Sequence, residues 1–182
     1  MIDRPVTITG PPGSGKSTAG RRVADRLGLE FRSAGERFRA EARRRGLNLG
    51  DFSRFAEAHE EVDRALDDQM VALAARGRLI EGRLTGALCR RRGVPCVYLH
   101  VTADADVRYR RLAERDGLPY ESAVRATRDR EASERDRYLR FYGIDLDAEV
   151  PDFSVDSTNE TPETVAHRLL DYLGALRSGP TP

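Results

Sequence analysis

The sequence predicts an α/β domain in which a five-stranded parallel sheet is covered by helices on both faces. Short apolar segments at 6–9, 29–33, 78–81, 96–101 and 153–156 alternate with longer amphipathic segments. This alternation favours parallel strands that are joined by crossover helices. With 182 residues, 39% of them hydrophobic and 34% charged, the chain is expected to form one domain with a substantial core.

The first expected strand, 6–9, leads into a glycine-rich loop, which is followed by a helix expected over 18–27. The loop reads Gly10, Pro11, Pro12, Gly13, Ser14, Gly15, Lys16, Ser17, Thr18. It matches G-x-x-x-x-G-K-[ST], a motif in which glycines allow a tight backbone whose N–H groups surround phosphate oxygens. The context predicts a P-loop NTPase fold, with Lys16 reaching the β- and γ-phosphates of ATP and the Ser17 hydroxyl binding Mg²⁺.

Lys16 is the only lysine in the chain, since every other strongly basic side chain is an arginine. A lysine carries a compact, mobile ammonium that a planar guanidinium does not replace. The composition therefore favours the P-loop interpretation over a glycine-rich turn that matches the motif by chance.

The middle of the chain is expected to be mainly helical. After the strand at 29–33, we expect a helix over 36–45, a break at 46–50 and one long helix over 51–75. Apolar side chains recur along the long helix at helical spacing and define one buried face. His59 lies on that face, so we expect it to pack rather than to catalyse.

The second half of the chain continues the alternation of helices and strands. Helices are expected over 103–115 and over 119–142, because Pro119 suits the start of a helix. A last helix begins near Thr161, and the side chains expected on its buried face are Val165, Leu169, Leu173 and Leu176. Ligands of parallel sheets bind at the carboxyl ends of the strands. The residues expected at that edge are the glycine-rich loop, Ser33, Glu81, Gly82, Arg83, Thr102, Asp156 and Ser157.

Composition argues against several classes of protein. The formal net charge is +1, which disfavours binding to nucleic acid or to a membrane surface through bulk charge. Cys89 and Cys96 form no C-x-x-C pair, so neither a zinc site nor a disulfide framework is expected. No apolar run is long enough to span a bilayer and no signal peptide is visible. We therefore expect a cytoplasmic monomer.

Three further segments carry a family resemblance. They are Ser33–Arg39, Glu81–Leu84 and Arg130–Asp145. In their order and spacing these segments resemble the archaeal-type cytidylate kinases, which are nucleoside monophosphate kinases of the P-loop superfamily. The resemblance extends over nearly the whole chain. Two departures are Glu36, where relatives usually carry Asp, and the absence of a tryptophan after Leu84.

The resemblance implies the adenylate-kinase-like strand order 2-3-1-4-5 and a division into a core and two mobile parts. The core comprises residues 1–33, 77–114 and 151–177. Residues 34–76 bind the monophosphate, residues 115–150 form a lid over the triphosphate, and residues 178–182 form a flexible tail. The implied reaction transfers a phosphoryl group from ATP to CMP or dCMP, with Mg²⁺.

The chemistry needs cations more than it needs a base. The acceptor phosphate is already ionised near neutral pH, so the protein must mainly align two polyanions and neutralise them. By resemblance, the acceptor phosphate is bound by Arg39 and Arg83, the transferring group by Arg115, Arg130 and Arg137, and the adenine by Arg111. Glu81, at a strand end beside the loop, is a candidate to hold a Mg²⁺-bound water. Ser33 is a candidate acceptor-site residue.

Three residues of the monophosphate-binding segment, 34–76, are candidates for recognising the cytosine base: Asp63, Asp67 and Gln69. A carboxylate accepts a hydrogen bond from the amino group of cytosine, and the sequence leaves open which residue does so. Two alternatives to the main hypothesis also remain open. One is a kinase of the same fold for AMP, UMP, a modified pyrimidine nucleotide or a small alcohol. The other is a P-loop ATPase or nucleotide switch.

Overall fold

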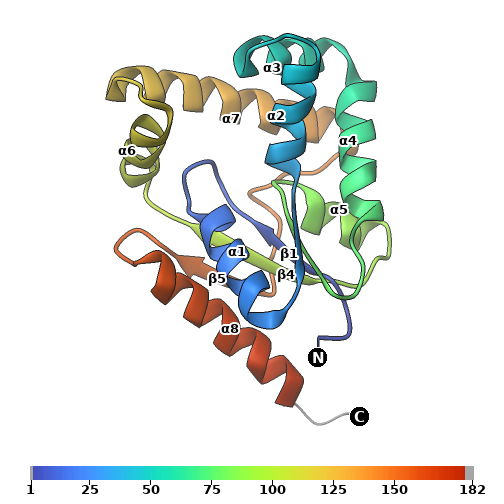
Figure 1. Cartoon of the computed structure of the whole chain (residues 1–182). Coiled ribbons are helices and arrows are strands. Elements are labelled where there is room, and N and C mark those ends of the chain that lie inside the picture. The colour runs from blue at the N-terminus through green and yellow to red at the C-terminus, as the bar shows by residue number, and fades with distance from the viewer. Residues whose placement is uncertain (1, 179–182) are drawn as a thin grey trace.

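The computed structural model describes residues 2–178 and shows one parallel sheet whose strand order is β2-β3-β1-β4-β5 (Figure 1). The strands are β1 (Val6–Thr9), β2 (Glu30–Ser33), β3 (Arg78–Glu81), β4 (Val97–Thr102) and β5 (Phe153–Asp156). The predicted fold class and strand order are therefore confirmed. The register places Glu81 opposite both Ile8 and Ser33, so the carboxyl ends of β1, β2 and β3 meet at one edge.

Side chains of alternating strand positions build two cores, one on each face of the sheet. Val97, Leu99 and Val101 of β4 pack on one face with α1 (Lys16–Leu27) and α8 (Pro162–Ser178). Tyr98 points to the opposite face, where α5 (Thr85–Arg91) packs. Burying an aliphatic side chain of this size contributes roughly 1.5–3 kcal/mol. The two cores hold the carboxyl edge of the sheet in a fixed position.

The remaining helices stand beyond that edge (Figure 1). Between β2 and β3 the chain forms α2 (Ala34–Arg44), α3 (Leu49–Ala58) and α4 (Glu60–Ala72). Between β4 and β5 it forms α6 (Ala105–Asp116) and α7 (Tyr120–Tyr142). Helices α3 and α7 contact each other, so the two insertions meet above the sheet.

The predicted single helix over 51–75 is wrong, because the chain breaks at His59 between α3 and α4. His59 has φ −133° and ψ 77°, which is not helical. Its ring stacks on Phe55 with centroids 3.9 Å apart, and its Nδ1 lies 2.8 Å from the Phe55 carbonyl oxygen. The side chain thus occupies the carbonyl that the His59 N–H would bond in a continuous helix. His59 therefore packs on Phe55, as predicted, but it does so at a break between two helices and not on the buried face of one helix.

The C-terminal end of α8 also differs from the sequence prediction. Leu176, expected on the buried face, is 44% exposed because the last turns of the helix extend past the sheet (Figure 1). The predicted flexible tail, 178–182, lies outside the described residues except for Ser178, the last residue of α8. Within residues 2–178, no helix combines the length and the apolar character needed to cross a membrane.

Candidate active site

The loop between β1 and α1 has the backbone that its glycines predict. Gly10, Gly13 and Gly15 have φ values of 147°, 79° and 82°. A Cβ on Gly10 would lie 2.0 Å from the Val101 carbonyl oxygen, and one on Gly13 would lie 2.5 Å from that of Arg108. Gly15 precedes α1 without a side-chain cap, so N–H groups of the first helical turn remain available to an anion.

Lys16, at the start of α1, points into this loop. Its Nζ donates to the Pro11 carbonyl oxygen at 3.3 Å and lies 3.7 Å from Glu81 Oε1. Burial lowers the pKa of Lys16 to about 8, with further lowering by the charges of Arg83 and Arg130, although the carboxylates of Glu81 and Glu134 oppose the shift. A phosphate would restore the missing negative charge around this ammonium.

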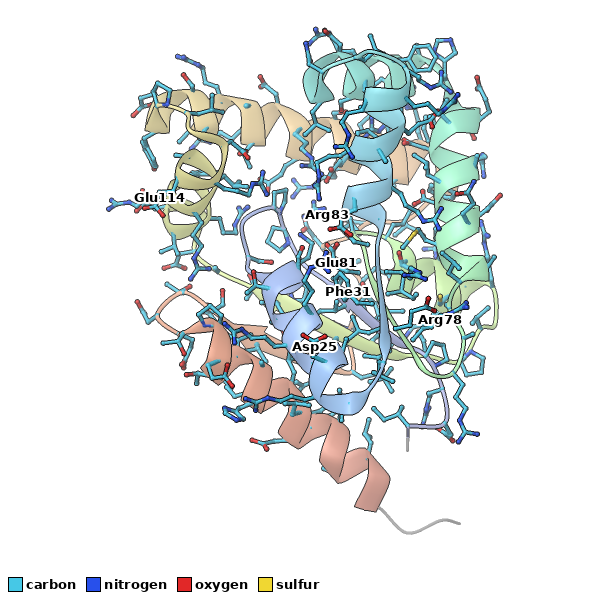
Figure 2. The ribbon with its side chains drawn as sticks, in the orientation of Figure 1. Asp25, Phe31, Arg78, Glu81, Arg83 and Glu114 are labelled. Carbon is cyan, nitrogen blue, oxygen red and sulfur yellow. The ribbon has the colours of Figure 1, made fainter. Side chains whose placement is uncertain are left out.

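Glu81 and Ser33 lie side by side at the ends of β3 and β2. The Ser33 hydroxyl donates to the Glu81 carboxylate and accepts from the backbone N–H of Glu36 at 3.2 Å, which caps α2. Glu81 is buried, and Figure 2 shows it close to Arg83 at the upper end of the sheet. A serine in α1 and an adjacent buried carboxylate are oxygen donors of the kind that Mg²⁺ uses beside nucleotide phosphates.

A cleft of about 740 Å³ opens above the loop. It is lined by these predicted site residues: Pro12, Gly13, Ser14, Gly15, Lys16, Ser17, Thr18, Arg39, Asp67, Glu81, Arg83, Arg111, Arg115 and Arg130. The structure therefore gathers the loop, two insertions and a strand end around one space. Gly10 and Pro11 line a separate cavity of about 400 Å³, which shares Arg83 with the cleft. Four of the predicted site residues line neither cavity: Ser33, Asp63, Gln69 and Arg137.

Arg83 and Arg130 converge on one buried carboxylate. Glu134, on α7, accepts a hydrogen bond from Arg130 Nε at 2.7 Å, and its other oxygen lies 2.9 Å from Arg83 Nε. Burial would raise the pKa of Glu134, but the charges of Arg130 and Arg83 hold it at about 2. Sequence reasoning missed Glu134. The available signal was its position four residues after Arg130, which is the spacing of a helical ion pair.

Two of the predicted arginines that line the cleft, Arg39 and Arg115, are exposed, whereas the others are half-buried. Burial and the nearby charge of Arg115 lower the pKa of Arg39. Arg115 forms a two-pronged contact with the neighbouring Asp116, at 2.7 and 2.8 Å. Among residues 2–178, neither guanidinium has a hydrogen bond or an ion pair with a buried partner, so both can reorient toward a polyanion.

Arg137 is placed differently from Arg130, although the two lie two turns apart on α7. Its guanidinium is buried, with Nε 3.1 Å from Asp63 Oδ2 and a terminal nitrogen donating to the Ser53 carbonyl oxygen at 3.1 Å. Both residues face the same side of α7, but α3 and α4 cover that side at Arg137. The structure therefore does not bring Arg137 and Asp63 into the cleft.

Asp67 is the base-reading candidate that lines the cleft. It accepts a hydrogen bond from the Tyr142 hydroxyl at 2.8 Å, and burial raises its pKa to about 7. Gln69, by contrast, is exposed and accepts from Arg37 at 3.0 Å.

Arg111 holds the phosphate loop against the loop after β5. Its terminal nitrogens donate to the Ser157 hydroxyl at 2.9 Å, to the Ser157 carbonyl at 2.7 Å and to the Gly13 carbonyl at 3.5 Å. Arg108, which sequence reasoning missed, also contacts the phosphate loop, because it donates to the Pro12 carbonyl oxygen at 2.9 Å. No local motif marks such contacts, because their partners lie far away in the sequence and most of them are backbone atoms.

Comparisons with known proteins show which proteins the chain is similar to. Residues 6–140 match the family model described as an AAA domain. The chain is 41% identical over 174 residues to the cytidylate kinase of Aeropyrum pernix, covering 94% of this chain and 99% of that protein. It is 39% identical over 144 residues to the cytidylate kinase of Archaeoglobus fulgidus, 78% of each chain.

The solved structures that resemble the chain include the shikimate kinase of Acinetobacter baumannii in complex with shikimate. The TM-score is 0.60 at 17% identity, and the match covers 96% of both chains. At this identity the likeness shows the shared P-loop kinase fold alone.

Proposed function

Because the chain belongs to the cytidylate kinases, a family of nucleoside monophosphate kinases, we propose that it transfers the γ-phosphoryl group of ATP to CMP or dCMP. The products are ADP and the corresponding diphosphate. The observation that carries the proposal is the convergence of Lys16 and four arginines from separate elements on one cleft: Arg39, Arg83, Arg115 and Arg130.

The number and origin of these cations favour transfer over simple hydrolysis. The phosphate loop with Lys16 suffices to bind the donor triphosphate. Arg39 on α2 and Arg83 after β3 add charge on the acceptor side, where the attacking oxygen of a monophosphate must be brought in line. An ATPase or a nucleotide switch has no need of a second phosphate site.

The donor set fits Mg²⁺. Ser17 is exposed at the cleft and the Glu81 carboxylate lies beside Lys16. Within residues 2–178, no group of three or more His, Cys, Asp or Glu side chains forms a metal cage. Such a set suits an ion bound mostly by nucleotide phosphates and water, with Ser17 as a ligand and Glu81 holding a water. When bound, Mg²⁺ neutralises charge on the phosphates.

Asp67 is the residue that we propose to read the base. The Tyr142 hydroxyl binds its Oδ2, which leaves Oδ1 to accept a hydrogen bond from the exocyclic amino group of cytosine. Uracil presents a carbonyl oxygen at that position, and a carboxylate would repel it. Asp63 and Gln69 are already engaged by Arg137 and Arg37, so Asp67 is the preferred choice among the three candidates.

We also propose that residues 34–76 and 115–150 close over the two nucleotides, whereas the sheet and its covering helices stay fixed. Arg39 and Arg115 support this division, because each lies exposed on one of these segments and lines the cleft. Closure would bring both guanidiniums onto phosphates and exclude water from the transferring group.

An acceptor panel tests the proposal. ADP release is measured with ATP and each of CMP, dCMP, UMP and AMP, and without an acceptor. We expect the highest kcat/KM with a cytosine nucleotide and only slow hydrolysis without an acceptor. A preference for AMP or UMP would contradict the proposed recognition of cytosine, but it would still support phosphoryl transfer to a nucleoside monophosphate. Rapid acceptor-independent hydrolysis would reject phosphoryl transfer as the function.

A further inference from the structure

We propose that Glu134 is a positioning residue for phosphoryl transfer, which holds the guanidiniums of Arg83 and Arg130 in the orientation that the transferring group requires. The inference rests on the proposed function, because it names a residue that acts through the two arginines of that same site.

The Glu134 carboxylate lies between two arginines and contacts both of them. Its side chain projects from α7, is 6% exposed and lines the cleft. One carboxylate oxygen lies 2.7 Å from Arg130 Nε on the same helix, and the other lies 2.9 Å from Arg83 Nε, which follows β3. A single carboxylate therefore ties the acceptor-side arginine of the core to an arginine of the segment that we propose to close.

The contact leaves the phosphate-binding edges of the arginines available. Glu134 engages both guanidiniums through Nε, so it leaves their terminal nitrogens to other acceptors. One terminal nitrogen of Arg83 donates to the Gly10 carbonyl oxygen at the long distance of 3.3 Å, and phosphate oxygens are stronger acceptors for such nitrogens. The Arg83 contact is an ion pair without hydrogen-bond alignment, since neither Arg83 Nε nor Glu134 Oε2 has a hydrogen-bond partner among the described residues. Arg83 is thus oriented by Glu134 but is not locked to it.

Charge explains why a carboxylate is needed at this point. The cleft contains Lys16 as well as Arg83 and Arg130, and like charges in a poorly solvated space repel one another. Glu81 compensates Lys16 from one side, and Glu134 compensates the two arginines from the other. A buried guanidinium that loses its partner is destabilised and tends to turn toward other acceptors.

The ion pair between Asp136 and Arg140 is an internal comparison. It has the same i, i+4 spacing on α7, with 3.1 Å between Oδ2 and Nε, but both side chains are more than half exposed. A purely structural pair on this helix resembles that one. Glu134 differs because it is buried and because both of its partners line the cleft.

The test compares E134Q with the matched variant D136N in the ATP and CMP assay, together with thermal unfolding of each protein. E134Q keeps the size and an acceptor oxygen of the side chain but removes its charge. We expect kcat to fall about 10- to 100-fold in E134Q, as for a small misplacement of reacting groups, with a smaller change in the KM for ATP. D136N should stay within twofold of the wild type in both constants. Wild-type kcat in a folded E134Q would overturn the proposal.

A double-mutant cycle separates positioning from a structural role. If Glu134 acts through the arginines, E134Q should cost at least threefold less in kcat/KM when R83A or R130A is already present than in the wild type. The same loss in all three backgrounds would overturn the proposal. Should E134Q fail to fold, E134D carries the test. It retains the charge, is one methylene shorter, and should lose kcat because it cannot reach both arginines; wild-type kcat in E134D would contradict the inference.

Failure of the proposed function is distinguishable from failure of this inference. If the wild type turns over UMP or AMP instead of CMP, the cycle is run with that acceptor and the prediction for Glu134 stands unchanged. If the wild type transfers no phosphoryl group to any monophosphate, the proposed function fails, and the positioning role falls with it.

Discussion

The phosphate loop and the arginines that surround the cleft are both expected to bind nucleotide phosphates, yet they are held in place in different ways. Gly10, Gly13 and Gly15, with φ values of 147°, 79° and 82°, set the shape of the loop within the eight consecutive residues of the motif, 10–17. The arginines come from α2, α6, α7 and the end of β3, and carboxylates or backbone oxygens far along the chain hold several of them.

This difference separates what is rigid from what is adaptable. The shape of the loop depends on its glycines, so a change at a non-glycine position such as Lys16 alters the charge of the loop rather than its shape. The arginines form a network of side chains, in which the partner of each guanidinium decides whether it faces phosphate or the protein interior. We therefore expect the largest effect from a change of charge in the loop and smaller effects from changes in the network.

Substitution of Lys16 by alanine should reduce kcat by about a thousandfold or more, because it removes the ammonium expected on the β- and γ-phosphates. Steady-state ADP release with saturating CMP measures the effect. Lys16→Arg should also be strongly impaired, since the planar guanidinium does not fit a site shaped by the Pro11 carbonyl and Glu81. Normal turnover of Lys16→Ala would contradict the assignment of the loop.

The next largest effect should distinguish Arg130 from Arg137. Arg130→Ala should lower kcat by about a hundredfold, because its guanidinium lines the cleft. It should cost less stability than Arg137→Ala, because the buried Glu134 carboxylate keeps Arg83 as a second partner. Arg137→Ala leaves Asp63 buried without its partner and should cost about 3–5 kcal/mol of unfolding free energy. Urea unfolding and kcat are measured for both variants. A large kcat loss in a stable Arg137→Ala would restore Arg137 to the transferring group, as the family resemblance implied.

The contrast between these two arginines also shows how far the sequence alone can reach. The strand order, the loop and the approximate helix positions could be predicted, because each depends on a local pattern or on the alternation of strands and helices. The break at His59 and the burial of Arg137 could not, since each depends on a side chain meeting a particular neighbour. Helical spacing placed Arg130 and Arg137 on one face of α7 but gave no information about which helices cover that face.

Arg39→Ala should act mainly on acceptor binding. Arg39 is exposed on α2 and has no buried hydrogen-bond or ion-pair partner in the described part of the chain, so its removal should leave the fold and the donor site intact. We expect the KM for CMP to rise about tenfold to thirtyfold, the loss of one charged hydrogen bond, and the KM for ATP to stay within twofold. An equal rise in both constants would assign Arg39 to the donor side of the cleft.

The smallest expected effect concerns Asp67 and is a dependence on pH. Burial raises the pKa of Asp67 to about 7, and only the ionised carboxylate accepts from the cytosine amino group without carrying a proton of its own. The competent form is therefore present above this pKa and is lost as the pH falls through it. Between pH 8 and pH 6 the ionised fraction falls about tenfold, so the KM for CMP should rise by up to about tenfold.

The phosphate of CMP titrates in the same range, with a second pKa of about 6, so the wild-type profile alone does not isolate Asp67. Asp67→Asn supplies the control, because its amide can accept from cytosine without titrating and should show only the part of the pH dependence that belongs to the phosphate. The same variant tests stability. A carboxyl whose pKa is raised in the folded state stabilises the protein below its ordinary pKa and loses that contribution as the pH rises to about 7. Asp67→Asn should therefore melt at a higher temperature than the wild type at pH 8, by a margin that narrows at pH 5. Identical pH profiles of KM in the two proteins would show that Asp67 does not read the base.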